Sequence, residues 1–155
     1  MKLSNLNEWL TLLANVGVLA GIVFLGMEMQ QNTQMMRAQT RDSVTDKLMN
    51  WYMDISTDLY AAEILVKGNT GETLEGAEFR SYEFMILSNL RMWENEWYQY
   101  QIGLFEQAEF EPRLVGWGNL VRNIPGYTLI WERNRDTFSP EFRDQIDSLI
   151  ADNKD

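Results

Sequence analysis

Residues 9–27, WLTLLANVGVLAGIVFLGM, decide the fold, because they are nineteen consecutive residues without a charged side chain. A helix of this length covers roughly 28 Å, close to the ~30 Å hydrocarbon thickness of a bilayer. Its bulky apolar side chains fall on every side of a helix, whereas a core helix of a small soluble domain normally keeps one polar stripe for solvent. The pattern predicts that residues 1–28 form a transmembrane anchor helix, which makes the lipid bilayer the first expected partner.

Two alternatives to an anchor remain open. The stretch contains Thr11, Asn15 and three glycines, so it is also compatible with the core helix of a soluble helical bundle. A cleaved signal peptide is the second alternative, because Lys2 precedes the apolar run. It is disfavoured because residues 24–28, FLGME, offer no A-x-A cleavage site and because the apolar region of a signal peptide has only about 7–15 residues.

The charges that flank the stretch predict its orientation. Lys2 precedes it, whereas Arg37, Arg41 and Lys47 follow it. Because Lys and Arg are enriched on the cytoplasmic side of a span, this bias predicts an N-terminus outside and a C-terminal domain in the cytoplasm. The absence of cysteine fits a reducing compartment without requiring one.

Residues 29–155 are long enough for one domain with its own core. Residues 1–50 carry four basic and four acidic side chains, and residues 51–155 carry nine basic and nineteen acidic ones, so the net charge of −10 lies in the distal part. An acidic surface is repelled by phosphate backbones and by anionic lipid headgroups. We therefore predict an acidic domain that binds no nucleic acid and whose charge serves solubility or, less commonly, a protein partner.

Apolar residues recur at helical spacing along the whole chain, and no segment alternates as a strand would. The sequence therefore predicts an all-α fold, in which the N-terminal transmembrane helix continues into a helical bundle of about five further helices. In the continuation of the first helix, five residues are expected to form a buried stripe: Val44, Leu48, Trp51, Tyr52 and Ile55.

Capping residues predict where the first helices of the bundle begin and end. Thr57 is expected to cap a helix that ends at residues 67–69, Lys-Gly-Asn. Thr73 is expected to cap a long helix that Gly103 ends.

Prolines predict the starts of the remaining helices. Pro112 fits the first turn of one helix, and Pro125-Gly126 is expected to be a turn before a helix over residues 127–138. The run Ser139-Pro140-Glu141 has the features of a helix start and predicts a final helix over residues 142–151.

The long central helix carries the clearest core pattern of the acidic domain. Eight bulky residues step by three or four along it: Phe79, Tyr82, Ile86, Leu90, Trp93, Trp97, Tyr100 and Leu104. Aromatic residues at helical spacing are usually core, so this helix is expected to be the centre of the bundle. An aromatic cradle for a ligand is the alternative.

The chain offers little for catalysis. It has no histidine and no cysteine, which removes the commonest general base, metal ligands and thiol nucleophile. Glu83, Glu94 and Glu96 lie on the aromatic helix, but di-iron bundles also need Glu-x-x-His motifs. Arg80 precedes Glu83 by three residues and Arg91 precedes Glu94 by three, so surface ion pairs explain Glu83 and Glu94 more simply. We predict no catalytic, cofactor-binding or metal-ligating residue, and no cofactor.

One motif in the apolar run is typical of helices that pack against each other in a membrane. Gly17 and Gly21 form a GxxxG pattern, and together with Ala14 they would give a groove of small residues where two helix backbones approach closely. Asn15 could add a hydrogen bond between helices, worth on the order of 0.6–2 kcal/mol in lipid. These four residues predict a homo-oligomer that packs through its membrane helices. The alternative is that glycines are simply common in membrane helices.

The junction of the apolar run and the polar segment after it resembles a known pattern. Residues 17–25, GVLAGIVFL, are followed by residues 28–33, EMQQNT, and then by Met36-Arg37-Ala38. This is similar to the N-terminal signature of an uncharacterised family of small bacterial single-pass membrane proteins, in which an apolar helix precedes a Gln-Asn-Thr…Arg-Ala stretch. Gln30 stands where that family often has a basic residue. The resemblance covers roughly the first 45 residues and implies a bacterial single-pass membrane protein, but it implies no site. We predict the bacterial inner membrane as its location.

Three classes of function follow from these patterns. The first is a non-enzymatic, membrane-anchored oligomeric scaffold or accessory subunit with an acidic cytoplasmic domain. The second is a homo-oligomeric pore, in which Thr11, Asn15 and the polar segment from Gln30 to Gln34 would line a water path. The third is a helical bundle that binds a small ligand, or a small enzyme that uses carboxylates and tyrosines.

Overall fold

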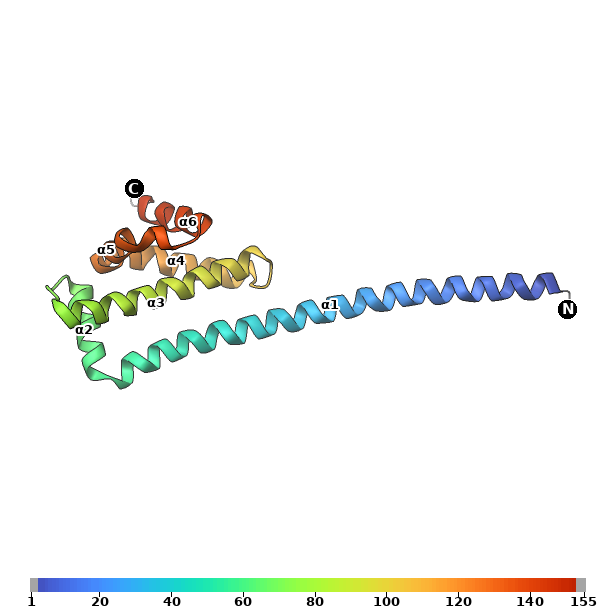
Figure 1. Ribbon diagram of the computed structural model, residues 1–155, viewed down its shortest axis with the longest axis horizontal. Coiled ribbons are helices and arrows are strands. Elements are labelled where there is room, and N and C mark those ends of the chain that lie inside the picture. The colour runs from blue at the N-terminus through green and yellow to red at the C-terminus, as the bar shows by residue number, and fades with distance from the viewer. Residues whose placement is uncertain (1–2, 153–155) are drawn as a thin grey trace. The chain divides into compact units, whose positions relative to one another are not determined.

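The computed structural model describes residues 3–152, and within them the chain is all-α (Figure 1). Its α-helices are α1 (Leu3–Thr57), α2 (Leu59–Thr70), α3 (Gly76–Gln101), α4 (Gln107–Asn123), α5 (Pro125–Asn134) and α6 (Pro140–Ala151). A short 3-10 helix, η1 (Arg135–Thr137), follows α5. The predicted fold class is confirmed: a long, apolar N-terminal helix precedes five further α-helices in the described part of the chain.

The chain divides into two units, Met1–Gln39 and Thr40–Asp155. In the first unit, every side chain from residue 5 to residue 39 is exposed within the monomer. The second unit contains the end of α1 and all the other helices. The boundary between the two units, after Gln39, marks where α1 begins to pack against other helices. The boundary predicted after residue 28 marks where the apolar run ends.

The junction of α1 and α2 is capped by Asp58 rather than by Thr57. The Asp58 carboxylate accepts hydrogen bonds from the backbone N–H groups of Tyr60 and Ala61, at 2.9 and 3.2 Å. The Thr57 hydroxyl instead donates to the Met53 carbonyl oxygen at 2.6 Å, so Thr57 belongs to the last turn of α1. Helix α2 also continues past the predicted end to Thr70, where Gly71 takes a left-handed conformation with φ of 80°.

Other predicted boundaries of α3 and α5 are also shifted. Helix α3 begins after Glu75 instead of Thr73, and its last residue is Gln101, two residues before the left-handed Gly103. Pro125 is the first residue of α5, where its missing N–H costs nothing, so no separate turn precedes this helix. The start predicted at Ser139-Pro140-Glu141 is confirmed, although the Ser139 side chain makes no capping hydrogen bond.

Pro112 lies inside α4, which begins five residues earlier, at Gln107. A proline in a helix interior leaves the carbonyl group four residues before it without its usual N–H partner. That residue is Ala108, which is exposed. Water can therefore satisfy the carbonyl oxygen, which explains why the helix extends on both sides of the proline.

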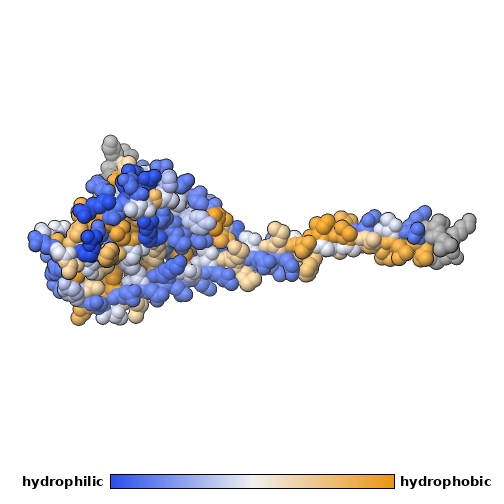
Figure 2. Space-filling model, viewed as in Figure 1, coloured by the Kyte–Doolittle hydropathy of each residue, from blue (hydrophilic) through white to orange (hydrophobic). Residues whose placement is uncertain are grey.

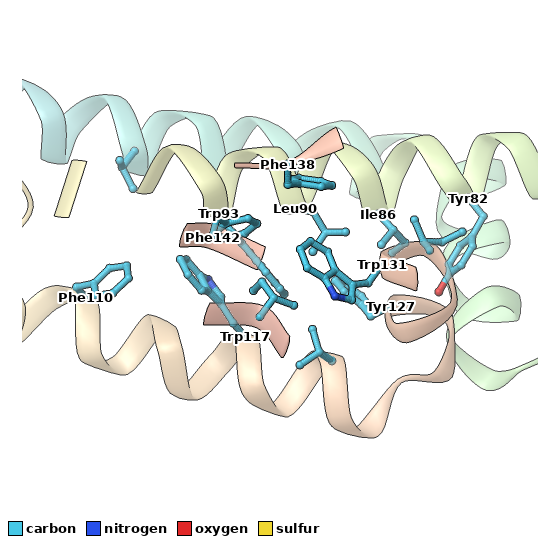
Figure 3. Close-up of a cluster of buried hydrophobic side chains, with 14 of the residues drawn as sticks. Tyr82, Ile86, Leu90, Trp93, Phe110, Trp117, Tyr127, Trp131, Phe138 and Phe142 are labelled. Carbon is cyan, nitrogen blue, oxygen red and sulfur yellow. The ribbon is translucent and has the colours of Figure 1, made fainter. Parts of the chain in front are cut away.

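Helix α3 is the centre of the bundle, as predicted. Tyr82, Ile86, Leu90 and Trp93 are each at most 3% exposed. Phe79, Trp97 and Tyr100 are partly buried against the same core, whereas Leu104 lies beyond the end of the helix. Figure 3 shows the labelled stripe facing buried residues from later parts of the chain: Phe110, Trp117, Tyr127, Trp131, Phe138 and Phe142.

The stripe predicted at the end of α1 is only partly buried. Val44 joins the core at 2% exposure, but Leu48, Trp51 and Ile55 are half-buried and Tyr52 is 51% exposed. The expectation of a fully buried stripe was therefore wrong. The large side chains on this part of α1 border a cavity instead of interlocking with the neighbouring helices.

Tyr82 is held between two glycines of neighbouring helices, which leads to a prediction about stability. A Cβ atom on Gly68 of α2 or on Gly126 of α5 would overlap the Tyr82 side chain. We expect Gly126→Ala to destabilise the fold by about 1–3 kcal/mol, because overpacking forces a buried ring out of its place. Urea unfolding followed by tryptophan fluorescence would measure this.

Gly116→Ala is the matched control for that substitution, because a Cβ at Gly116 meets nothing within 4 Å. This variant should be neutral or more stable by up to about 1 kcal/mol, as expected for alanine in a helix interior. If Gly126→Ala unfolds at the same urea concentration as Gly116→Ala, the close packing around Tyr82 is not a determinant of stability.

Candidate functional site

Ala14, Gly17 and Gly21 lie on one face of α1, because steps of three and four residues return to the same side of a helix. Nothing lies within 4 Å of the position that a Cβ would take on Gly17 or Gly21. A glycine in a helix interior costs roughly 0.5–1 kcal/mol relative to alanine. Within the described chain no contact requires these glycines, whereas a second helix packed on this face would use them.

Asn15 lies on a different side of α1 from this groove. At about 100° of rotation per residue, it is roughly 160° around the helix from Gly17. The Thr11 hydroxyl, which was predicted to line a pore with Asn15, donates to the Asn7 carbonyl oxygen at 2.9 Å and is satisfied within its own helix. The hydrogen bond from Asn15 to another helix and the pore both remain predictions.

The described part of α1 contains a stretch that is long and apolar enough to cross a membrane, and none of that stretch is buried. Figure 2 shows hydrophobic side chains gathered along this helix, while the surface drawn for the second unit is mostly hydrophilic. Leu10 and Leu19, at 55% and 63% exposure, lie about 180° apart around α1. The predicted length and apolar character of residues 9–27 are therefore confirmed.

The second unit contains a cavity of about 280 Å³ between the last turns of α1 and helices α2 to α5. Five of the residues that line it are aromatic: Trp51, Tyr52, Trp93, Trp117 and Tyr127. Trp93 stacks on Trp117 and on Tyr127, with ring centroids 5.1 and 5.6 Å apart. Sequence reasoning assigned Trp93 to the core, where it does lie (Figure 3), but the same ring also forms part of the cavity wall.

Two asparagines in the cavity wall are oriented by tyrosine hydroxyls. The Tyr82 hydroxyl donates to Asn69 Oδ1 at 2.9 Å, and the Tyr127 hydroxyl donates to Asn89 Oδ1 at 3.1 Å. Burial raises the pKa of Tyr82 to about 12 and also raises the pKa of Tyr127, so both hydroxyls keep their protons. Because the amide oxygens accept these bonds, the amide NH₂ groups are left as donors.

Glu96 is a fully buried acid next to this cavity. Its Oε1 accepts a hydrogen bond from Arg113 at 3.1 Å, and its Oε2 has no partner in the described part of the chain. Burial raises the pKa of Glu96 to about 7, against the opposing effect of the positive charge of Arg113. Arg113 itself lines the cavity and keeps 23% of its side chain exposed.

The acids on α3 are less exposed than predicted. Glu83 does pair with Arg80, but it is only 3% exposed, and Arg133 of α5 is a second partner at 3.7 Å. The expectation of surface pairs is wrong for Glu83, because the helices that pack on α3 cover it. Glu94 pairs with Arg91 at 2.7 Å and accepts a hydrogen bond from the Ser139 backbone N–H. Partial burial opposes ionisation, but these hydrogen bonds outweigh it and lower the pKa of Glu94.

No group of three or more His, Cys, Asp or Glu residues that could hold a metal ion is found within residues 3–152. No family model matches this chain, and comparison with curated proteins and with solved structures gives no match.

Proposed function

We propose that the chain is a non-enzymatic, membrane-anchored helical scaffold or accessory subunit. The observation that carries this proposal is the exposure of residues 9–27 on all sides of α1. In water this helix would present a continuous apolar surface, and such surfaces mark sites of interaction with proteins or membranes. The uncharged run has the length of a bilayer's hydrocarbon core, so a bilayer is the partner that covers all of its sides at once.

The face formed by Ala14, Gly17 and Gly21 supports oligomerisation within the membrane. Lipid tails are as apolar as leucine, so helices associate in a bilayer through close packing instead of the hydrophobic effect. Small residues permit that packing. The proposed assembly is a homo-oligomer in which this face is the contact between helices.

The proposed location is the inner membrane of a bacterium, with the N-terminus outside and the acidic domain in the cytoplasm. Support for a bacterial protein comes from the resemblance to the bacterial single-pass family, which rests on Gln31-Asn32-Thr33 and Arg37-Ala38. The excess of Lys and Arg after the apolar run supports this orientation.

The acidic domain is proposed to be the part that contacts a protein partner. Its negative charge favours a basic protein surface and disfavours nucleic acid and anionic lipid headgroups. A scaffold is preferred over an enzyme because the chain has no histidine or cysteine, and because the buried carboxylates of Glu83 and Glu96 are paired with arginines.

Fractionation of cells tests the anchor. We expect the protein to remain in the membrane after a carbonate wash. Replacing Val18 and Leu19 together with aspartate should release it, because each charge at the centre of a span costs about 2.5–3.5 kcal/mol. The matched control replaces Gln30 and Gln31 with aspartate, outside the apolar run, and should stay in the membrane.

Release of the unaltered protein by carbonate would contradict the anchor and favour the soluble bundle.

The orientation can be assigned in the same cells, because the chain has no cysteine of its own. A single cysteine at Asn7 should react with an impermeant maleimide in intact spheroplasts, and one at Asp152 should react only after lysis. The reverse pattern would overturn the proposed orientation.

A further inference from the structure

The cavity lies within the second unit and combines aromatic side chains with hydrogen-bonding groups. Its aromatic residues are accompanied by Leu48, Leu65 and Leu120, so most of its wall is apolar. A volume of about 280 Å³ lies just below the roughly 300–1,000 Å³ of sites for drug-sized molecules. This size suits a ligand with one or two rings.

The asparagine and arginine side chains of the wall offer donors. The oxygens of Asn69 and Asn89 are engaged by Tyr82 and Tyr127, which leaves their amide NH₂ groups to bind a ligand. Arg113 adds a guanidinium group, which has five N–H donors and no acceptor. A ligand that satisfies this wall must therefore bring acceptor atoms.

The charge of the wall also favours a ligand with acceptor atoms. Arg113 is the one charged residue among those that line the cavity in the described chain, and no lining residue is acidic. Its Nη1 donates to Glu96 Oε1 at 3.1 Å, and the guanidinium has further N–H donors. A carboxylate matches the planar guanidinium better than other small anions of low charge, because it can accept two parallel hydrogen bonds.

We propose that this cavity binds a small organic acid that carries one or two aromatic rings. The rings pack against the aromatic side chains of the wall, of which Trp51 and Tyr52 are more exposed than the stacked Trp93 and Trp117. The carboxylate accepts hydrogen bonds from Arg113 and from the asparagine amides. An amine with the same rings would meet donors and a positive charge, so the site discriminates by charge as well as by shape.

Calorimetric titration of the full-length protein in mild detergent tests the proposal, with detergent alone as the blank. The probes are phenylacetate and 1-naphthylacetate, each paired with an amine of the same ring system, phenethylamine and 1-naphthylmethylamine. We expect at least one acid to bind and its paired amine to bind at least tenfold more weakly. The proposal is overturned if neither acid binds at millimolar concentration, or if acid and amine bind equally.

A substitution of Gly116 tests whether the acid binds in this cavity. Gly116 lines the cavity, and a Cβ there meets nothing within 4 Å, so Gly116→Leu adds a side chain to the cavity wall from a position that accepts a Cβ. Leucine is also a better helix former than glycine, so the melting temperature should be unchanged or higher. We expect acid binding to weaken at least tenfold.

Val115→Leu is the matched control, because Val115 is the preceding residue of α4 and is 63% exposed. It should bind the acid as the unaltered protein does. Equal binding by Gly116→Leu and Val115→Leu would overturn the assignment of the site. These outcomes do not depend on membrane anchoring or on oligomerisation, so a failure of the proposed function would leave this test intact.

Discussion

Replacing Gly17 and Gly21 together with isoleucine is expected to abolish crosslinked oligomers of the protein in membranes. Two branched side chains on the contact face would hold the helix backbones apart and remove the packing that drives association in lipid. The monomer itself should tolerate the change, because a Cβ at either position meets nothing within 4 Å. Isoleucine is also favourable in a membrane span, so insertion should be preserved. Crosslinking in isolated membranes with an amine-reactive reagent, read by gel electrophoresis, measures the result.

Gly26 provides the control for this experiment. It also lies in the apolar run, with open space around its Cβ position, but it is roughly 140–180° around the helix from Gly21 and Gly17. Gly26→Ile should therefore leave crosslinking unchanged. If the double variant crosslinks as well as Gly26→Ile, the face formed by Ala14, Gly17 and Gly21 does not hold the oligomer together.

The sequence predicted the helices better than their ends. The stripe from Phe79 to Tyr100 identified α3 as the central helix, because burial of one face imposes a period that can be counted. The caps were placed one or two residues early, since adjacent polar residues compete for the same role. Thr57 and Asp58 are both capping residue types, and only the tertiary course of the chain decides between them.

The two candidate sites differ in how far the sequence reveals them. Ala14, Gly17 and Gly21 belong to a single helix, so helical geometry alone places them together. The cavity is formed by residues from five helices, α1 to α5, and no local pattern records how these pack. A signal for buried acids was nevertheless present, because Glu83 directly follows Tyr82 and Glu96 directly precedes Trp97, at the edges of the core stripe.

Glu96 makes the stability of the acidic domain depend on pH, and Glu96→Gln is expected to remove that dependence. The unfolded carboxyl ionises near its ordinary pKa of 4.5, and burial raises the folded pKa to about 7. Between these values the folded state binds more protons than the unfolded state, so the free energy of unfolding falls as the pH rises from 4.5 to 7. The penalty is fully present above pH 7 and amounts to about 3 kcal/mol. Glu96→Gln should therefore gain stability over the unaltered protein as the pH rises, which urea unfolding between pH 4.5 and pH 8 would measure.

Glu94 is the matched control, because it lies two residues earlier on α3 and its pKa is shifted in the opposite direction. Its hydrogen bonds from Arg91 and Ser139 stabilise the ionised form, so their contribution is present at neutral pH and is lost as the pH falls through the lowered pKa. Glu94→Gln should therefore be less stable than the unaltered protein at pH 7, whereas Glu96→Gln should be more stable. A Glu96→Gln variant that is destabilised at pH 7 and pH 8 alike would contradict this account. The ion pair with Arg113 would then outweigh the cost of burying the carboxylate, and Glu96 would stabilise the fold as a charged group.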